Sequence, residues 1–157
     1  MRVVAIIQAR MGSTRLPGKV MEDIGGHAML ARVIGRIKRA QLLHDVVVAS
    51  TVNPADKIIE DECKRLDVAV YRGKENDVLD RYYQAATLHR ADTIVRITAD
   101  CPLIDPAVVD RVIRAFLAEV PDYASNIIER SYPLGLDTEV TSMSALTRAW
   151  QGAKEAY

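Results

Sequence analysis

Aromatic residues and net charge are both scarce in this sequence. Aromatic side chains make up 5% of its 157 residues, with a single Trp and a single Phe. A platform on which the bases of a single-stranded nucleic acid stack is therefore not expected. Lys and Arg together number 21, and so do Asp and Glu. This balance argues against general binding to nucleic acids or to a membrane surface.

Cysteines are few, and long apolar runs are absent. Cys63 and Cys101 are far apart and have no histidine at a metal-ligand spacing, which excludes a disulfide framework and a zinc site. We expect reduced thiols, as in a cytoplasmic protein. The apolar run near the N-terminus is short and soon followed by charge, unlike a signal peptide. No stretch approaches the roughly 20 apolar residues of a membrane span.

The sequence does contain enough apolar residues for a core. They make up 49% of the chain, against 27% charged residues, which predicts one globular domain over residues 1–157. Charge is unevenly distributed, because residues 1–40 hold eight Lys or Arg and two Asp or Glu. This local excess predicts an anion-binding site near the N-terminus.

Strand-like and helix-like segments alternate up to Pro121. Short β-branched runs at 3–7, 46–49, 68–71 and 93–97 predict buried strands. Helical patterns cover 28–40, a segment that begins at Pro54, 76–88 with Asn76 as its N-cap, and 106–117 after Asp105. The alternation predicts an α/β fold, in which a mostly parallel sheet is covered by helices on both faces.

The alternation breaks after Pro121. Segments 123–128 and 138–141 read as strands, and a helix is expected from its cap Ser142 to Tyr157. That helix reaches the end of the chain without a glycine cap. The pattern is equally consistent with a chain cut short relative to a complete α/β enzyme and with a helix that frays.

The first polar cluster, residues 8–19 (QARMGSTRLPGK), follows the first strand. Ligands bind at the carboxyl ends of strands in sheets of this type. Gly12 and Gly18 allow backbone N–H groups to approach an anion, and Ser13 and Thr14 add hydroxyl donors. Three cations complete a set suited to a polyphosphate, namely Arg10, Arg15 and Lys19. The spacing is not that of a Walker A loop, and a merely solvated basic loop is the alternative.

The second cluster, Thr98 to Pro102, follows the fourth strand. Asp100 leaves this strand beside the predicted phosphate loop. A single carboxylate that acts with phosphate oxygens and water is a typical Mg²⁺ ligand. The alternative is that Asp100 only caps the next turn.

The third cluster spans 133–139 and contains Asp137 and Glu139. Their spacing on a predicted strand places them on one face, where they could bind sugar hydroxyls or assist a metal. Arg130 and Tyr132 precede them. A polar strand edge or a dimer contact is an equally good interpretation. Arg72 ends the third strand and could also face the site.

Several of these runs resemble the sugar cytidylyltransferases. The run at 7–19, IQARMGSTRLPGK, is similar to the N-terminal signature of enzymes that activate 3-deoxy-octulosonate and acylneuraminate as CMP conjugates. Within this family, the residues of this run look most like those of the spore coat polysaccharide biosynthesis protein F branch. Later runs fit the same branch: RG at 72–73, DVLDRYY at 77–83, RITADCPLI at 96–104 and YPLGLDTEV at 132–140.

The resemblance implies a nucleotide-diphospho-sugar transferase (Rossmann-like) fold. It implies a reaction in which an oxygen of an acidic sugar attacks the α-phosphorus of CTP and pyrophosphate leaves, with Mg²⁺ as cofactor. By position, Ala9 and Arg10 would lie by the base, and Asp100 would hold the metal. Phosphates would be bound by Ser13, Arg15 and Lys19. Catalysis is assigned to Arg15, Lys19 and Asp100, and further nucleotide contacts to Gln8, Gly12, Thr14, Arg72 and Thr98.

The acceptor sugar is assigned to the third cluster, that is, to Arg130, Tyr132, Asp137 and Glu139. A homodimer is left open by the resemblance. Related enzymes often have Gln two residues before the metal aspartate as a base contact, whereas this chain has Thr98, so the identity of the base is open. A glycosyltransferase or pyrophosphorylase of the same fold that uses another nucleotide is one alternative. A nucleotide-binding protein without activity is the other.

Overall fold

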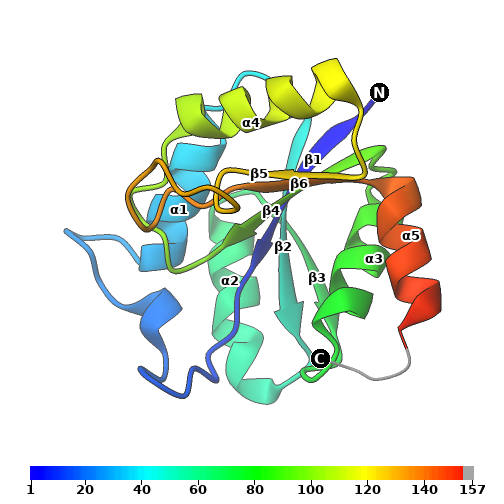
Figure 1. Cartoon of the computed structure of the whole chain (residues 1–157). Helices are drawn as coiled ribbons and strands as arrows, with labels where there is room; N and C mark the ends of the chain where they lie inside the picture. Colours follow the sequence, from blue (N-terminus) through cyan, green and yellow to red (C-terminus); the bar gives the residue numbers. More distant parts are fainter. Residues whose placement is uncertain (154–157) are drawn as a thin grey trace.

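A six-stranded mixed sheet forms the middle layer of the molecule (Figure 1). The computed structural model describes residues 1–153. Strand order across the sheet is β3-β2-β1-β4-β6-β5. Strands β1 to β4 run parallel, and β6 is antiparallel to both β4 and β5. The strands span β1 Val3–Gln8, β2 Asp45–Thr51, β3 Ala69–Gly73, β4 Thr93–Thr98, β5 Tyr123–Ser125 and β6 Glu139–Ser142.

Helices cover both faces of this sheet. On one face lie α1 (Met29–Ile37), α2 (Lys57–Arg65) and α4 (Pro106–Glu119), and on the other lie α3 (Val78–Leu88) and α5 (Met143–Gly152). Figure 1 shows α3 and α5 side by side. Short 3₁₀ turns occupy Lys19–Met21 and Pro54–Asp56. The predicted α/β fold with a mostly parallel, doubly covered sheet is confirmed.

Strand β1 lies in the interior of the sheet and is buried on both sides. Val3, Ala5 and Ile7 pack under α1, α2 and α4, whereas Val4 and Ile6 pack under α3 and α5. All five side chains are at most 2% exposed. Burial of an aliphatic side chain contributes about 1.5–3 kcal/mol, which explains why the strand is a continuous apolar run rather than an alternating one.

Two segments differ from the sequence-based expectation. The N-cap of α3 is Asp77, whose side chain accepts a hydrogen bond from the Asp80 backbone N–H at 2.9 Å, so Asn76 is not the cap. The strand predicted over 123–128 ends at Ser125, because the Asn126 side chain bonds the Thr138 N–H and turns the chain. Ser142 caps α5 as predicted. The predicted end of this helix at Tyr157 lies outside the described residues.

Two glycines should respond in opposite directions to an added methyl group. Gly35 on α1 has open space around the position of a Cβ atom, so Gly35→Ala should raise the free energy of unfolding by about 0.5–1 kcal/mol. A Cβ on Gly73 would lie 2.9 Å from Cγ of the buried Arg81 and 3.0 Å from the Tyr71 ring. Gly73→Ala should therefore lower the free energy of unfolding by about 1–3 kcal/mol. Urea unfolding of both variants measures the two changes, and equal values would contradict this packing.

Candidate functional site

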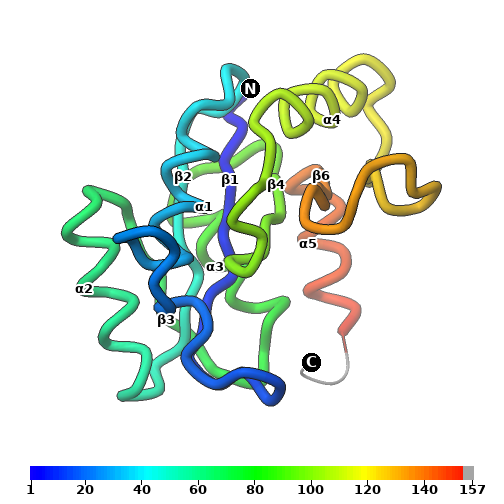
Figure 2. The backbone as a smooth tube through the Cα atoms, turned by 90° about the vertical axis from the view of Figure 1, so that its left-hand side faces the viewer, coloured from blue at the N-terminus to red at the C-terminus, as the bar shows by residue number. Residues whose placement is uncertain are grey.

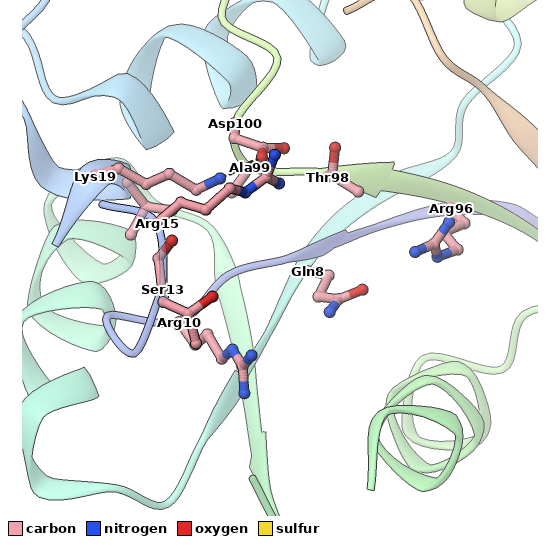
Figure 3. A pocket seen from close by; sticks show the side chains of 11 residues that line it. Gln8, Arg10, Ser13, Arg15, Lys19, Arg96, Thr98, Ala99 and Asp100 are labelled. Atoms are coloured by element: carbon pink, nitrogen blue, oxygen red, sulfur yellow. Dashed lines mark hydrogen bonds and ion pairs between the residues drawn. The ribbon is translucent and has the colours of Figure 1, made fainter. Parts of the chain in front are cut away.

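A polar cavity of about 270 Å³ opens where the carboxyl ends of β1 and β4 meet (Figure 3). The two strands are neighbours in register, with Gln8 beside Thr98. The segment after β1 and the residues after β4 therefore reach the same space. The cavity is lined by Gln8, Arg10, Ser13, Thr14, Arg15, Lys19, Val20, Arg96, Thr98, Ala99 and Asp100.

The first two predicted clusters meet in this cavity. Its lining includes the three predicted cations, both hydroxyl residues of the loop, Gln8, Thr98 and Asp100. Ala9 is instead buried, and its N–H is bonded to the Ala49 carbonyl at 3.1 Å. Gly12 is in the same loop but does not line the cavity.

The cations of the loop differ in their partners. Lys19 Nζ donates a hydrogen bond to Asp100, and Arg10 Nη1 lies 3.7 Å from a carboxylate oxygen of Glu75. Arg15 is exposed and has no ion pair within residues 1–153. In Figure 3 the side chains of Arg15 and Lys19 both extend toward the end of β4. The cavity thus offers one uncompensated guanidinium and one ammonium that a stronger anion could take from Asp100.

Asp100 carries a carboxylate that remains ionised at neutral pH. Partial burial acts to raise its pKa, but hydrogen bonds from Lys19 and Thr98 and the Lys19 charge outweigh this and hold the pKa below the ordinary value of 3.8. Its pairing with Lys19 therefore stabilises the fold above pH 3.8. That contribution is lost as the pH falls through the lowered pKa.

The fit of a magnesium ion can be tested on the carboxylates around the cavity. In the described part of the chain, no group of three or more His, Cys, Asp or Glu side chains could hold a metal ion by itself. Mg²⁺ retains several waters and is usually bound by one or two carboxylates together with phosphate oxygens. Asp100 at the mouth of a cationic loop fits such a shared ion. It does not make a site that would fill without a phosphate ligand.

A buried carboxylate that the sequence analysis did not single out holds the loop in place. Asp56 is 1% exposed and accepts a 2.8 Å hydrogen bond from the Met11 N–H. Its second oxygen accepts hydrogen bonds from Ser50 and Thr51 at the end of β2. Gly18, with φ of 76°, donates to the Met11 carbonyl at 2.9 Å and closes the loop. Both backbone groups of Met11 are thus fixed.

A second buried charge supports the Arg10 side of the cavity. Arg81, at the start of α3, is 1% exposed and donates to the carbonyls of Lys74 and Glu75 at 2.5 and 2.7 Å. Burial, together with the charge of Arg10, lowers the pKa of Arg81. These bonds fix the backbone at Glu75, whose carboxylate faces Arg10.

Arg72 and the third predicted cluster do not line this cavity. Arg72 is engaged by the Glu60 carboxylate at 3.0 Å and by the backbone carbonyls of Thr51 and Asn53. Figures 1 and 2 both show the 126–138 connection, which carries Arg130 and Tyr132, apart from the loop after β1. The expectation that Arg72 faces the pocket is therefore wrong for this cavity, because its guanidinium is turned toward α2.

Asp137 and Glu139 have separate partners. Strand β6 begins at Glu139, so Asp137 precedes it and the two do not share a strand face as expected. Asp137 pairs with Arg130 at 2.7 Å. Glu139 binds the cavity residue Arg96 and accepts a 2.9 Å hydrogen bond from the Tyr123 hydroxyl. Arg96 begins the run RITADCPLI noted in the sequence but was given no role there, because a single charge in an otherwise apolar strand does not reveal its partner.

The structure combines an α/β fold with a polar, cation-lined cavity at the carboxyl ends of β1 and β4. The family model described as Cytidylyltransferase matches residues 4–157. The chain belongs to the cytidylyltransferase family, and the resemblance found in its sequence is confirmed. No helix of the described residues is long and apolar enough to cross a bilayer.

Individual relatives agree with this assignment. An uncharacterized protein of Methanocaldococcus jannaschii is 42% identical over 100% of this chain and 63% of its own length. The spore coat polysaccharide biosynthesis protein SpsF of Bacillus subtilis is 34% identical over 92% of this chain and 60% of its own length. The chain thus spans about three fifths of these curated relatives.

Solved structures show the same fold. A cytidylyltransferase from Leptospira borgpetersenii superposes with a TM-score of 0.94 and 36% identity, covering 99% of this chain and 66% of that chain. A CMP:2-keto-3-deoxy-manno-octonic acid synthetase complexed with CTP gives a TM-score of 0.79 at 19% identity, with 99% and 80% coverage. At that identity the second match shows the fold alone.

Removal of the Asp56 carboxylate should loosen the loop. Asp56→Ala leaves the Met11 N–H and the buried hydroxyl of Thr51 without their acceptor, so we expect a loss of about 2–4 kcal/mol in the free energy of unfolding. Amide exchange at Met11 should accelerate more than exchange at β1. Urea unfolding and hydrogen exchange by NMR measure both effects. Asp61→Ala, an exposed position on α2, is the control, and an equally small effect at Asp56 would show that the buried carboxylate does not hold the loop.

Proposed function

We propose that this chain carries the nucleotide site of a CTP-dependent sugar cytidylyltransferase, which transfers CMP from CTP to an acidic sugar. The observation that carries the proposal is the convergence of Arg15, Lys19 and Asp100 on one polar cavity. Family membership and the names of the relatives support a cytidylyl transfer. By analogy with SpsF, we place the reaction in the biosynthesis of a surface polysaccharide.

In the proposed reaction an oxygen of the sugar attacks the α-phosphorus of CTP. The bond between the α-phosphorus and the bridging oxygen breaks, and pyrophosphate leaves with the electron pair. Negative charge therefore grows on the leaving group in the transition state. Arg15 and Lys19, on a loop that Asp56 anchors, line the cavity in which they would neutralise that charge.

Magnesium is the proposed cofactor, and its chemistry would be to neutralise and orient phosphate oxygens. Asp100 is the residue that would hold it. Asp100 is paired with Lys19 in the structure, so the binding of a metal-bound triphosphate implies an exchange of partners. The Lys19 ammonium would then bind a phosphate oxygen, and the Asp100 carboxylate would be free to hold the cation. This exchange keeps both charges compensated throughout.

The acceptor sugar remains assigned to residues beyond the cavity lining. Glu139 adjoins the cavity through Arg96, and Arg130, Tyr132 and Asp137 belong to the connection before β6. We propose that these residues contact the sugar. A homodimer stays part of the same proposal.

Loss of either loop cation should weaken nucleotide binding. Arg15→Ala and Lys19→Ala each remove a charge-assisted bond to phosphate, so the dissociation constant of CTP with Mg²⁺ should rise by roughly 10- to 150-fold, equivalent to about 1.5–3 kcal/mol. Added salt should weaken wild-type binding more than binding by the variants. Calorimetry measures these dissociation constants, and Arg111→Ala on α4 is the charge-matched control. Unchanged affinity in both loop variants would remove the loop from the site.

Asp100 should link metal binding to nucleotide binding. Two ligands that stabilise the same site raise each other's affinity by one common factor. Asp100→Asn removes the charge but keeps the shape, so it should abolish the effect of Mg²⁺ on CTP affinity. Affinity without metal should stay equal or improve slightly, because a carboxylate no longer repels the phosphates.

The comparison is a CTP titration with and without Mg²⁺ for wild type, Asp100→Asn and Asp137→Asn. We expect a smaller change for Asp137→Asn, which is assigned to the sugar. If Asp100→Asn retained the full effect of Mg²⁺ on CTP affinity, Asp100 would be a turn residue only. Asp137 and Glu139 would then be the next candidates for the metal ligand.

A further inference from the structure

Glu75, in the connection between β3 and α3, brings a carboxylate to the loop after β1. Its Oε1 atom lies 3.7 Å from Nη1 of Arg10. The same oxygen rests against the backbone of Gly12, because a Cβ atom placed on that glycine would lie 3.0 Å from it. Arg10 lines the cavity, whereas Glu75 is not part of the lining. Arg10 therefore borders the cavity and at the same time faces a carboxylate outside it.

The fold holds Glu75 by its side chain and by its backbone. Its Oε2 atom accepts a 3.1 Å hydrogen bond from Nδ2 of Asn53. The Asn53 side chain is itself held in the turn after β2, where its Oδ1 accepts from the Ala55 N–H at 3.0 Å. The Glu75 carbonyl accepts a 2.7 Å hydrogen bond from the buried Arg81. The position of this carboxylate is therefore set by the connections after β2 and β3 and does not depend on Arg10 alone.

The contact with Glu75 accompanies a separation of Arg10 from the other two cations of the loop. Figure 3 shows the side chains of Arg15 and Lys19 extending toward the end of β4, while the Arg10 side chain extends away from them. The side chains of Arg10 and Glu75 are 40% and 36% exposed, so water screens their attraction and the pair is weak. An anion in the cavity, with several oxygens to offer, can therefore compete with Glu75 for this guanidinium.

We propose that Glu75 is a positioning residue that keeps Arg10 from binding phosphate, so that Arg15 and Lys19 remain the phosphate-binding cations of the loop. The inference rests on the proposed function and deepens it. Three cations around one pyrophosphate would bind the leaving group tightly, and a product that stays bound prevents the next turnover. A carboxylate that occupies one guanidinium weakens the site for pyrophosphate and thereby favours its release, a step that limits the rate of many enzymes.

The action of Glu75 through Arg10 differs from simple repulsion between Glu75 and the ligand. A carboxylate near an anion site repels every anion, whether or not Arg10 is present. If Glu75 acts by holding Arg10, its removal has an effect only while there is a guanidinium to be released. The effects of substitutions at the two positions should then not add, and a double-mutant cycle measures this coupling.

The test is a calorimetric titration of the purified chain with inorganic pyrophosphate at low salt. Glu75→Gln removes the charge but keeps the size of the side chain and an oxygen that can accept from Asn53. It should lower the dissociation constant of pyrophosphate about 3- to 5-fold, the scale of an exposed ion pair. Glu119→Gln makes the same change of charge at the exposed end of α4, which Figures 1 and 2 show apart from the loop after β1. This control should leave the constant unchanged.

Arg10→Ala completes the cycle and separates the positioning role from a structural one. In the Arg10→Ala background, Glu75→Gln should change the pyrophosphate constant by less than about 2-fold, because no guanidinium remains to be released. The same 3- to 5-fold gain in that background, or no gain from Glu75→Gln in the wild-type background, would overturn this inference and leave the proposed function standing. A wild-type chain that binds neither pyrophosphate nor CTP with Mg²⁺ would overturn the proposed function itself.

Discussion

Parallel pairing of β1 with β4 is the constraint on which the site depends. Five apolar side chains of β1 are buried on both faces of the sheet, which fixes its position between β2 and β4. Parallel strands deliver their carboxyl ends to one edge. Gln8 and Thr98 become neighbours for that reason, and the cations after β1 meet Asp100 after β4. If β4 were shifted by one residue against β1, the side chains of β4 would point to the opposite face of the sheet. The residues that line the cavity would then no longer meet.

The parts of the site predictable from the sequence share one property, namely that their signal is local. Cations, glycines and hydroxyls crowd into 12 residues after a buried strand, and Asp100 directly follows another strand. The alternation of strands and helices is local in the same sense, so the fold class was predictable too. Asn76 shows the limit of such signals: the adjacent Asp77 has the same capping chemistry, and in the structure Asp77 is the cap.

The residues that sequence reasoning missed act through distant partners. Asp56 reaches Met11 across 45 positions, and Arg96 binds Glu139 across 43. In the sequence, Asp56 is an acid near a helix start and Arg81 a helical base, each of which is ordinarily solvated. Their burial becomes evident only when the fold supplies backbone groups to pair with them. The same holds for Arg72, whose guanidinium was free to face either the pocket or α2 until Glu60 was placed beside it.

Some polar groups of this site have hydrogen-bond or ionic partners within the described chain, and others do not. Asp56 and Arg81 have their partners within the chain, and such groups give rigidity because any movement would leave them buried and unpaired. Lys19 and Asp100 are paired with each other but partly exposed, so their bond can be exchanged at little cost. Arg15 has no ionic partner among the described residues, and the Gln8 oxygen has no hydrogen-bond donor. A rigid frame thus carries exchangeable charges where phosphates would bind, with one unpaired carboxamide beside them.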